Sequence, residues 1–391
     1  MFKNLHELIA TMPDEKSCRD YLAKARWEDG KAICPYCGYS KCYIIENGKR
    51  YKCGSKECYK KFSVTVGTIF EASNIPLNKW FMAVYLCTAH KKGISSYQLG
   101  KDIGVSQKCA WFMLHRIREL MRDKKETKLD NIVELDEVYM GGKVSRMSKT
   151  KRAILRENNE TMSHKAMVMG MIERGGNLKL ITIGKDKSAN KMLPVVFNNI
   201  DKDAVVITDG NGVYTHLTKD FAGHEVVNHE QDEYVRDKTI HTNTIEGAFS
   251  HFRRSIYGIY HQCSVKHLSR YCDETAFRYN LRKMTDKERF NLSLTQIEGR
   301  LKWKNLIDKS KGDGYDQVTF KPNSNLTYVS NEPRNRWDAK AVVQIDLHGE
   351  IVARYPSIRE ACRITGLKKR AITIVLSGRN KTTGGYYWKY E

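Results

Sequence analysis

The spacing of hydrophobic residues changes near residue 130. Before it, apolar positions recur every three or four residues, which predicts helices, above all over 77–93 and 95–120. After it, short apolar runs between polar turns predict strands. We expect strands at 132–140, 165–173, 177–185, 204–208 and 224–228, and a helix at 188–200.

The order of these strands indicates how they pair. Short turns connect the first three, which are expected to be antiparallel, whereas the helix before the fourth favours a parallel crossover. This order matches the mixed sheet of the RNase H-like fold, in which the first and fourth strands lie side by side. We therefore predict an α/β core over 129–285.

Three acidic residues lie at informative places in this pattern. Asp136 interrupts the first strand, Asp209 follows the fourth, and Glu246 lies in the helical segment HTNTIEGAFSHFRR. A carboxylate among apolar residues is costly unless it is paired or bound to a metal. Two carboxylates from neighbouring strands and one from a helix can hold the hard ions, Mg²⁺ or Mn²⁺, of phosphodiester chemistry.

Each acid also has a simpler interpretation. Asp136 could belong to a buried polar network, Asp209 could serve only its Asp-Gly turn, and Glu246 could form a surface ion pair. Glu137 follows Asp136 directly, so a shift of one residue in the strand register would exchange their roles.

The predicted helix carries further polar residues on one face. Asn243 lies three positions before Glu246 and Arg253 lies seven after it, so all three share that face. We expect Arg253 to hold a phosphate at or beside the scissile bond.

Four cysteines have the spacing of a metal site. They form the patterns C-P-Y-C and C-G-S-K-E-C and are Cys34, Cys37, Cys53 and Cys58. Four thiolates on two tight turns predict a structural Zn²⁺ site with no open position, in a zinc ribbon over 1–70. Cys42 is a nearby thiol that could replace one ligand, and a set of buried thiols without metal is the alternative.

Two short helices around Gly104 predict a helix-turn-helix within 71–128. Ser95 with Gln98 forms a capping box for the first helix, and Ser106 caps the second. The second helix would enter the major groove of DNA. Its polar candidates for DNA contact are Gln107, Lys108, His115, Arg116 and Arg118. An ordinary helical hairpin is the alternative interpretation.

The charge of the chain indicates a polyanionic partner. The 391 residues include 67 Lys and Arg against 45 Asp and Glu, a formal charge of +22. Double-stranded DNA fits this excess better than a membrane does, and no apolar run is long enough to predict a transmembrane helix. The 11 cysteines, four of them in a metal spacing, favour an intracellular, DNA-associated protein over a disulfide framework.

The chain resembles bacterial insertion-sequence transposases with an N-terminal zinc ribbon, the ISXO-like group, in the blocks VELDEVYMGGK, ITDGNGVY and HTNTIEGAFSHFRR and in the ribbon itself. This resemblance implies a DDE-type transposase with Asp136, Asp209 and Glu246 as its acidic triad and Mg²⁺ or Mn²⁺ as cofactor. Members of the group differ in whether an Asn or the Glu is the third ligand, so Asn243 is the alternative. We also expect a dimer or larger assembly on DNA, because two ends must be processed together.

A second compact pattern follows a polar linker predicted over 286–340. Residues 341–391 read as a hairpin, two short helices and a final strand, and they carry nine Lys or Arg against four Asp or Glu. They resemble the small, NUMOD-type DNA-binding motif at the C-terminus of homing endonucleases. Candidate DNA contacts around the start of its second helix are Lys368, Lys369, Arg370 and Thr373.

These expectations combine into one functional hypothesis. The N-terminal modules would recognise transposon ends, and the core would cleave them and transfer the strands into target DNA. One alternative is an RNase H-like nuclease or resolvase that does not join strands. The other is a catalytically inactive, domesticated DNA-binding regulator.

Overall fold

The chain forms two compact units, Met1–Tyr328 and Val329–Glu391. The computed structural model describes residues 2–27, 30–124, 127–141, 147–157, 165–184, 188–215, 217, 220–227, 235–236, 240–261, 263–308, 341–356, 358–367, 369–376 and 381–390. Within these ranges, no helix has the length and apolar character needed to cross a membrane.

The first unit begins with two helices and a small antiparallel sheet. These elements are α1 (Leu5–Thr11), α2 (Glu15–Arg26), β1 (Cys42–Ile45), β2 (Arg50–Cys53) and β3 (Lys61–Phe62). β1 and β2 form the predicted hairpin, and Asn47 and Gly48 make its turn with φ angles of 56° and 79°. The sheet supplies the framework of the predicted zinc ribbon.

The next three helices contain the predicted helix-turn-helix. They are α3 (Leu77–Ala89), α4 (Ser96–Ile103) and α5 (Gln107–Met121). Ser95 and Ser106 cap α4 and α5 as expected, and Gly104 makes the turn between them with a φ of 63°. The capping box at α4 is only half formed, because the Gln98 side chain donates to Asp102.

A five-stranded mixed sheet forms the centre of the first unit. Its strands are β4 (Ile132–Met140), β5 (Ala166–Glu173), β6 (Leu178–Gly184), β7 (Val205–Asp209) and β8 (Gly223–Val227), in the order β6-β5-β4-β7-β8. β4, β5 and β6 pair antiparallel, whereas β7 is parallel to both β4 and β8. The predicted α/β sheet, with its first and fourth strands adjacent, is confirmed.

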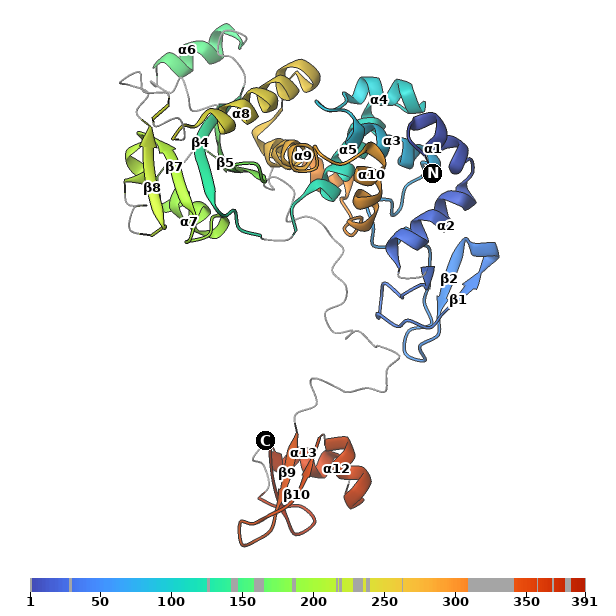
Figure 1. Cartoon of the computed structure of the whole chain (residues 1–391). Helices are drawn as coiled ribbons and strands as arrows, with labels where there is room; N and C mark the ends of the chain where they lie inside the picture. The colour runs from blue at the N-terminus through green and yellow to red at the C-terminus, as the bar shows by residue number, and fades with distance from the viewer. Residues whose placement is uncertain are drawn as a thin grey trace. The chain divides into compact units, whose positions relative to one another are not determined.

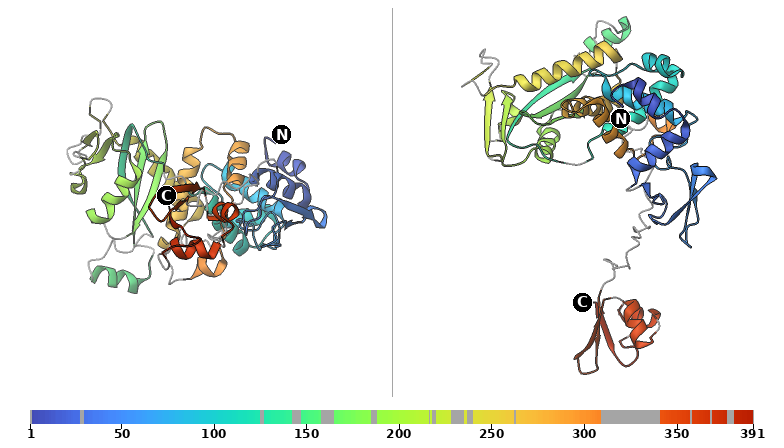
Figure 2. Two further views of the ribbon diagram at one scale, coloured as in Figure 1. Left: turned by 90° about the horizontal axis from the view of Figure 1, so that it is seen from below. Right: turned by 45° about the vertical axis from the view of Figure 1, so that its right-hand side comes forward.

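Helices cover both faces of this sheet (Figure 1). α7 (Ala189–Asn199) packs on the face that carries Leu135. α8 (Asn243–Ser255) and α9 (Leu268–Asn280) pack on the face that carries Val138. Figure 2 shows from two further directions how α8 runs alongside β4 and β5. One more helix, α6 (Lys149–Glu157), lies between β4 and β5 in the sequence.

The segment that follows α9 corrects the linker prediction, which began at residue 286. α10 (Asp286–Thr295) and α11 (Trp303–Ile307) are helices, and Phe290 and Leu306 are fully buried. The Phe290 ring packs edge-on against Phe81 of α3, with centroids 5.7 Å apart. The apolar residues of this segment are few and widely spaced. Their periodicity therefore did not predict that they complete the core of an earlier module.

The second unit contains the predicted hairpin, helices and final strand. They are β9 (Val342–Ile345), β10 (Ile351–Tyr355), α12 (Ile358–Thr365), α13 (Lys369–Leu376) and β11 (Tyr387–Tyr390). The strands form an antiparallel sheet in the order β10-β9-β11. Ala361, Ile372 and Trp388 are buried together, so this unit has a hydrophobic core of its own.

Candidate functional site

Asp136 and Asp209 lie side by side on the two central strands. β4 and β7 are in parallel register with Leu135 opposite Thr208, so the residues that follow them, the two aspartates, are neighbours as well. Carboxylate oxygens of Asp136, Glu137 and Asp209 all lie within 4.8 Å of one another. The expectation that the first and fourth strands bring their acids together is confirmed.

This acidic cluster has the chemistry of a divalent-cation site. Carboxylate oxygens are the ligands that hard cations prefer, and three half-buried carboxylates this close repel one another unless protons or a cation neutralise them. The Asp209 carboxylate also accepts the N–H of Asn211 at 3.3 Å in the turn after β7. Its role in the turn therefore does not prevent it from binding a metal.

Glu246 stands apart from this cluster. It lies in the first turn of α8, its side chain is exposed, and Thr242 Oγ1 lies 3.5 Å from its Oε1. Among the acidic residues that the structure describes, Glu137 is the one grouped with both aspartates. From the sequence, Glu137 was expected only to exchange roles with Asp136 if the strand register shifted by one residue. The sequence feature that could have identified Glu137 as part of the cluster is its place directly after Asp136 in an apolar strand.

α8 carries the other predicted site residues. Asn243, Glu246 and Arg253 are all exposed. The helix packs directly on the strand pair that carries Asp136, because the residue opposite Asp136 on β5 is Gly170. A Cβ atom at Gly170 would lie only 2.6 Å from the ring of Phe249 on α8. The absence of a side chain at this position thus allows the close approach of the helix.

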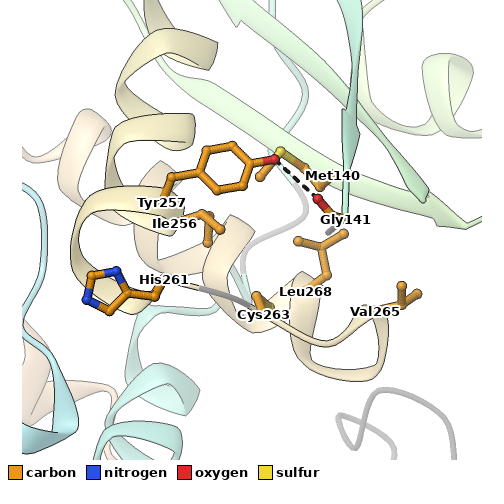
Figure 3. Close-up of a pocket in the computed structure, with 8 residues that line it drawn as sticks. All are labelled: Met140, Gly141, Ile256, Tyr257, His261, Cys263, Val265 and Leu268. Carbon is orange, nitrogen blue, oxygen red and sulfur yellow. Dashed lines mark hydrogen bonds between the residues drawn. The ribbon is translucent and has the colours of Figure 1, made fainter. Parts of the chain in front are cut away.

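A small apolar pocket lies where β4 ends (Figure 3). Met140, Ile256 and Leu268 are among its lining residues, and Tyr257 Oη donates to the carbonyl oxygen of Gly141 at 3.4 Å. The cavity volume is about 30 Å³, which is room for about two water molecules. This space is too small for a nucleotide base.

The four predicted ribbon cysteines converge. The Sγ atoms of Cys34, Cys37, Cys53 and Cys58 all lie within 4.8 Å of one another, and four thiolates fit a tetrahedral zinc ion. Burial raises the pKa of the Cys37 thiol to about 11, so a cation is needed to keep it as a thiolate at neutral pH. The fifth thiol, Cys42, lies outside this group and points its Sγ to the carbonyl oxygen of Tyr39.

We expect purified protein to contain one zinc ion per chain and Cys53→Ser to lose it. Cys53 is fully buried in the cluster, and the free energy of binding a structural zinc is also free energy of folding. Zinc content by mass spectrometry and proteolysis of the ribbon would measure both effects. Cys42→Ser is the matched control and should keep its zinc. Full zinc occupancy in Cys53→Ser would contradict the assignment.

The start of α5 is exposed to solvent. Gln107 and Lys108 are both exposed. Gln107 lines an open groove at the turn together with Tyr97 and Lys101 of α4. The Lys108 ammonium lies 5.0 Å from the centre of the Trp303 ring. Both side chains are therefore accessible, and their contact with DNA stays a prediction.

The prediction that Arg116 contacts DNA is wrong. Its side chain is 3% exposed, and its guanidinium donates to the carbonyl oxygens of Leu301 and Glu71. His115 and Arg118 are buried as well. α9 packs against this part of α5. Helical periodicity shows which polar residues share a face of a helix. It does not show whether that face is exposed to solvent or packed against another helix.

The C-terminal candidates lie at the limit of the described structure. The backbone of Lys369, Arg370 and Thr373 belongs to α13. Lys368 and the side chains of these three residues lie outside the described residues. Their contact with DNA stays a prediction.

Comparison with protein families matches three parts of the chain. Residues 128–280 match the ISXO2-like transposase domain, and residues 13–61 match the transposase zinc-ribbon domain. Residues 343–389 match the DNA endonuclease I-HmuI-like, NUMOD-like domain. These matches cover the acidic cluster, the four cysteines and the second unit respectively.

Two curated proteins are similar to parts of the chain. An uncharacterized protein in transposable element ISH50 of Halobacterium salinarum is 30% identical over 257 residues, which are 63% of this chain and 84% of that protein. The probable mobile endonuclease B of enterobacteria phage T4 is 33% identical over 72 residues, which are 18% of this chain and 26% of that protein.

The fold, the acidic cluster and the cysteine cluster agree with these comparisons. The similarity to the ISH50 protein extends over most of that protein, and both domains expected of such a transposase are matched. The chain belongs to the insertion-sequence transposases that combine an N-terminal zinc ribbon with an ISXO2-like DDE domain.

Proposed function

We propose that this protein is a DNA transposase that cleaves the ends of its mobile element and joins them to target DNA. The observation that carries the proposal is the juxtaposition of Asp136 and Asp209 on neighbouring parallel strands. The face of the sheet beside them is covered by α8, the helix that carries Glu246 and Arg253. The transposase zinc-ribbon domain precedes this core in the sequence, and the DNA endonuclease-like domain follows it.

Asp136 and Asp209 are the residues that would hold Mg²⁺ or Mn²⁺, with Glu246 as the third ligand and Asn243 as its alternative. Bound divalent ions would activate the attacking hydroxyl and stabilise the leaving oxygen of the phosphodiester. We prefer Glu246 to Glu137 because α8 covers the face on which Asp136 lies. Glu137 alternates with Asp136 along β4, but its carboxylate still lies within 4.8 Å of both aspartates, so Glu137 is a further candidate for the third ligand.

Arg253 would bind the substrate strand. It is exposed in the last turn of α8, and Arg254 beside it is exposed too. A guanidinium holds a phosphate through two parallel hydrogen bonds, so Arg253 would fix the DNA backbone near the acidic cluster. Gln107 and Lys108 would contact the terminal repeats, and the C-terminal module would add a second, tethered DNA contact.

A strand-joining assay tests this function. Protein, Mg²⁺, labelled terminal-repeat DNA and a target plasmid are expected to give labelled plasmid. Replacing Mg²⁺ with Ca²⁺ should stop the reaction while leaving the zinc in place, which a strong chelator would not do. Cleavage of the labelled ends without joining would favour the nuclease alternative. DNA binding without cleavage would favour an inactive regulator.

A further inference from the structure

Glu134 is a buried carboxylate that the proposed chemistry does not use. It lies two positions before Asp136 on β4, and its side chain is 0% exposed. Side chains alternate along a strand, so Glu134 and Asp136 project from the same face, the one covered by α8. Burial of a charged group is costly unless hydrogen bonds and opposite charge compensate it, so its partners identify its role.

These partners include the first turn of α8. Glu134 Oε2 accepts the N–H groups of Thr244 and Ile245 at 2.8 and 3.0 Å, and Oε1 accepts the Thr244 hydroxyl at 2.8 Å. The first N–H groups of a helix have no partner within the helix. Thr242, at the N-cap position, makes no side-chain capping bond. The sheet itself therefore caps the helix, through a residue 110 positions away.

Arg174 completes the attachment. Its Nε donates to Glu134 Oε1 at 2.7 Å, and its Nη2 donates to the carbonyl oxygen of His241 at 2.9 Å. One guanidinium thus joins the carboxylate to the chain just before α8. The negative charge of Glu134 at the N-terminus of α8 is also favourable for the helix dipole.

We infer that Glu134 is a positioning residue that fixes the place of Glu246 relative to Asp136. The strand that carries Asp136 holds the N–H of Ile245 through Glu134, and Glu246 is the next residue. Gly170 sets the height of the same helix above the strands. The first turn of α8 cannot slide along β4 without breaking the bonds of a buried carboxylate. This inference rests on the proposed function, in which Glu246 is a metal ligand.

Calorimetric titration of Mn²⁺ into full-length, zinc-loaded protein tests the inference without requiring activity. Binding that is lost in Asp136→Asn defines the acidic site. Glu134→Gln keeps the shape of the side chain but removes its charge, and we expect it to weaken Mn²⁺ affinity about tenfold, as residues that orient metal ligands do. Glu173→Gln is the matched control. It lies near the end of β5, accepts a bond from Asn131, and should leave the affinity unchanged.

A double-mutant cycle shows whether Glu134 acts through Glu246. In the Glu246→Gln background, adding Glu134→Gln should weaken Mn²⁺ binding by less than about twofold, because the two effects are coupled. An equal loss of Mn²⁺ affinity in the wild-type and Glu246→Gln backgrounds would contradict an action of Glu134 through Glu246.

Melting temperatures measured on the same samples separate positioning from stability. A cap that is only structural would lower the melting temperature of Glu134→Gln and leave its Mn²⁺ affinity unchanged, which would overturn the inference. If Glu134→Gln does not fold, Thr244→Ala removes one hydrogen bond and should weaken binding about threefold; unchanged binding there would overturn the inference too. Wild-type protein without Asp136-dependent Mn²⁺ binding would contradict the proposed function as well.

Discussion

Asp209→Asn is expected to lower the rate of end cleavage at least about a thousandfold, because several kcal/mol of transition-state stabilisation depend on the bound cation. The amide keeps the size of the side chain and can still accept the N–H of Asn211 in the turn after β7. It lacks the negative charge with which Asp209 and Asp136 would hold the ion. Single-turnover cleavage of labelled terminal-repeat DNA at saturating Mg²⁺ measures the effect.

The control for this variant is Asp203→Asn. Asp203 is exposed just before β7, so its replacement removes the same charge away from the acidic cluster. Its cleavage rate should stay within about twofold of the wild-type rate, as for most surface substitutions. Both variants should bind terminal-repeat DNA in a mobility-shift assay. Persistent strand joining by Asp209→Asn would remove Asp209 from the mechanism.

Glu274→Ala is expected to destabilise the first unit by about 3–5 kcal/mol, because it leaves buried charges without a partner. Glu274 lies on α9 with its side chain 1% exposed, and Arg118 Nε of α5 donates to it at 2.8 Å. Arg278 forms an ion pair with the same carboxylate, and Tyr260 Oη donates to it at 2.7 Å. Urea unfolding followed by helical circular dichroism measures the loss.

The exposed Lys16–Asp20 pair provides the comparison for Glu274. Its two side chains are 68% and 53% exposed, and Asp20→Asn should change stability by less than about 1 kcal/mol. If Glu274→Ala proved as mild as Asp20→Asn, the charge network between α5 and α9 would not hold the helix-turn-helix to the core.

The lowered pKa of Glu274 determines how the stability of the first unit depends on pH. Burial acts to raise the pKa of Glu274, but Arg118 and Arg278 outweigh it and lower the pKa from 4.5 to about 2. A carboxyl group with a depressed pKa stabilises the folded state fully above its unfolded pKa. The contribution is lost as the pH falls from about 4.5 towards 2. Glu274→Ala should therefore flatten the stability profile over this range, and an unchanged slope would contradict the network.

The sequence was sufficient for those features that depend on local pattern. Apolar runs and turns predicted β4 and β7, and the crossover helix between them implied that Asp136 and Asp209 would meet. The cysteine spacing predicted the thiol cluster, because a tight turn brings the two members of each pair close together. Ser106 was identified as a cap because capping involves residues only a few positions apart.

Features that depend on distant packing were missed. Arg116 is polar on a helix that α9 and the segment around Leu301 cover, and nothing within α5 distinguishes this burial from exposure. Glu134 alternates with apolar residues like Asp136, but its partner is the start of a helix 110 positions later. Phe290 belongs to a segment that follows the five-stranded sheet in the sequence but completes the core of the N-terminal helices.

Anomalous diffraction can locate the cation directly. Crystals of the protein with Mn²⁺ and a cleaved terminal repeat would be measured at the manganese absorption edge. We expect a manganese peak at the carboxylates of Asp136 and Asp209, with Glu246 among the residues that hold the ion. Manganese bound only elsewhere on the chain, or held without Asp209, would contradict the proposed catalytic site.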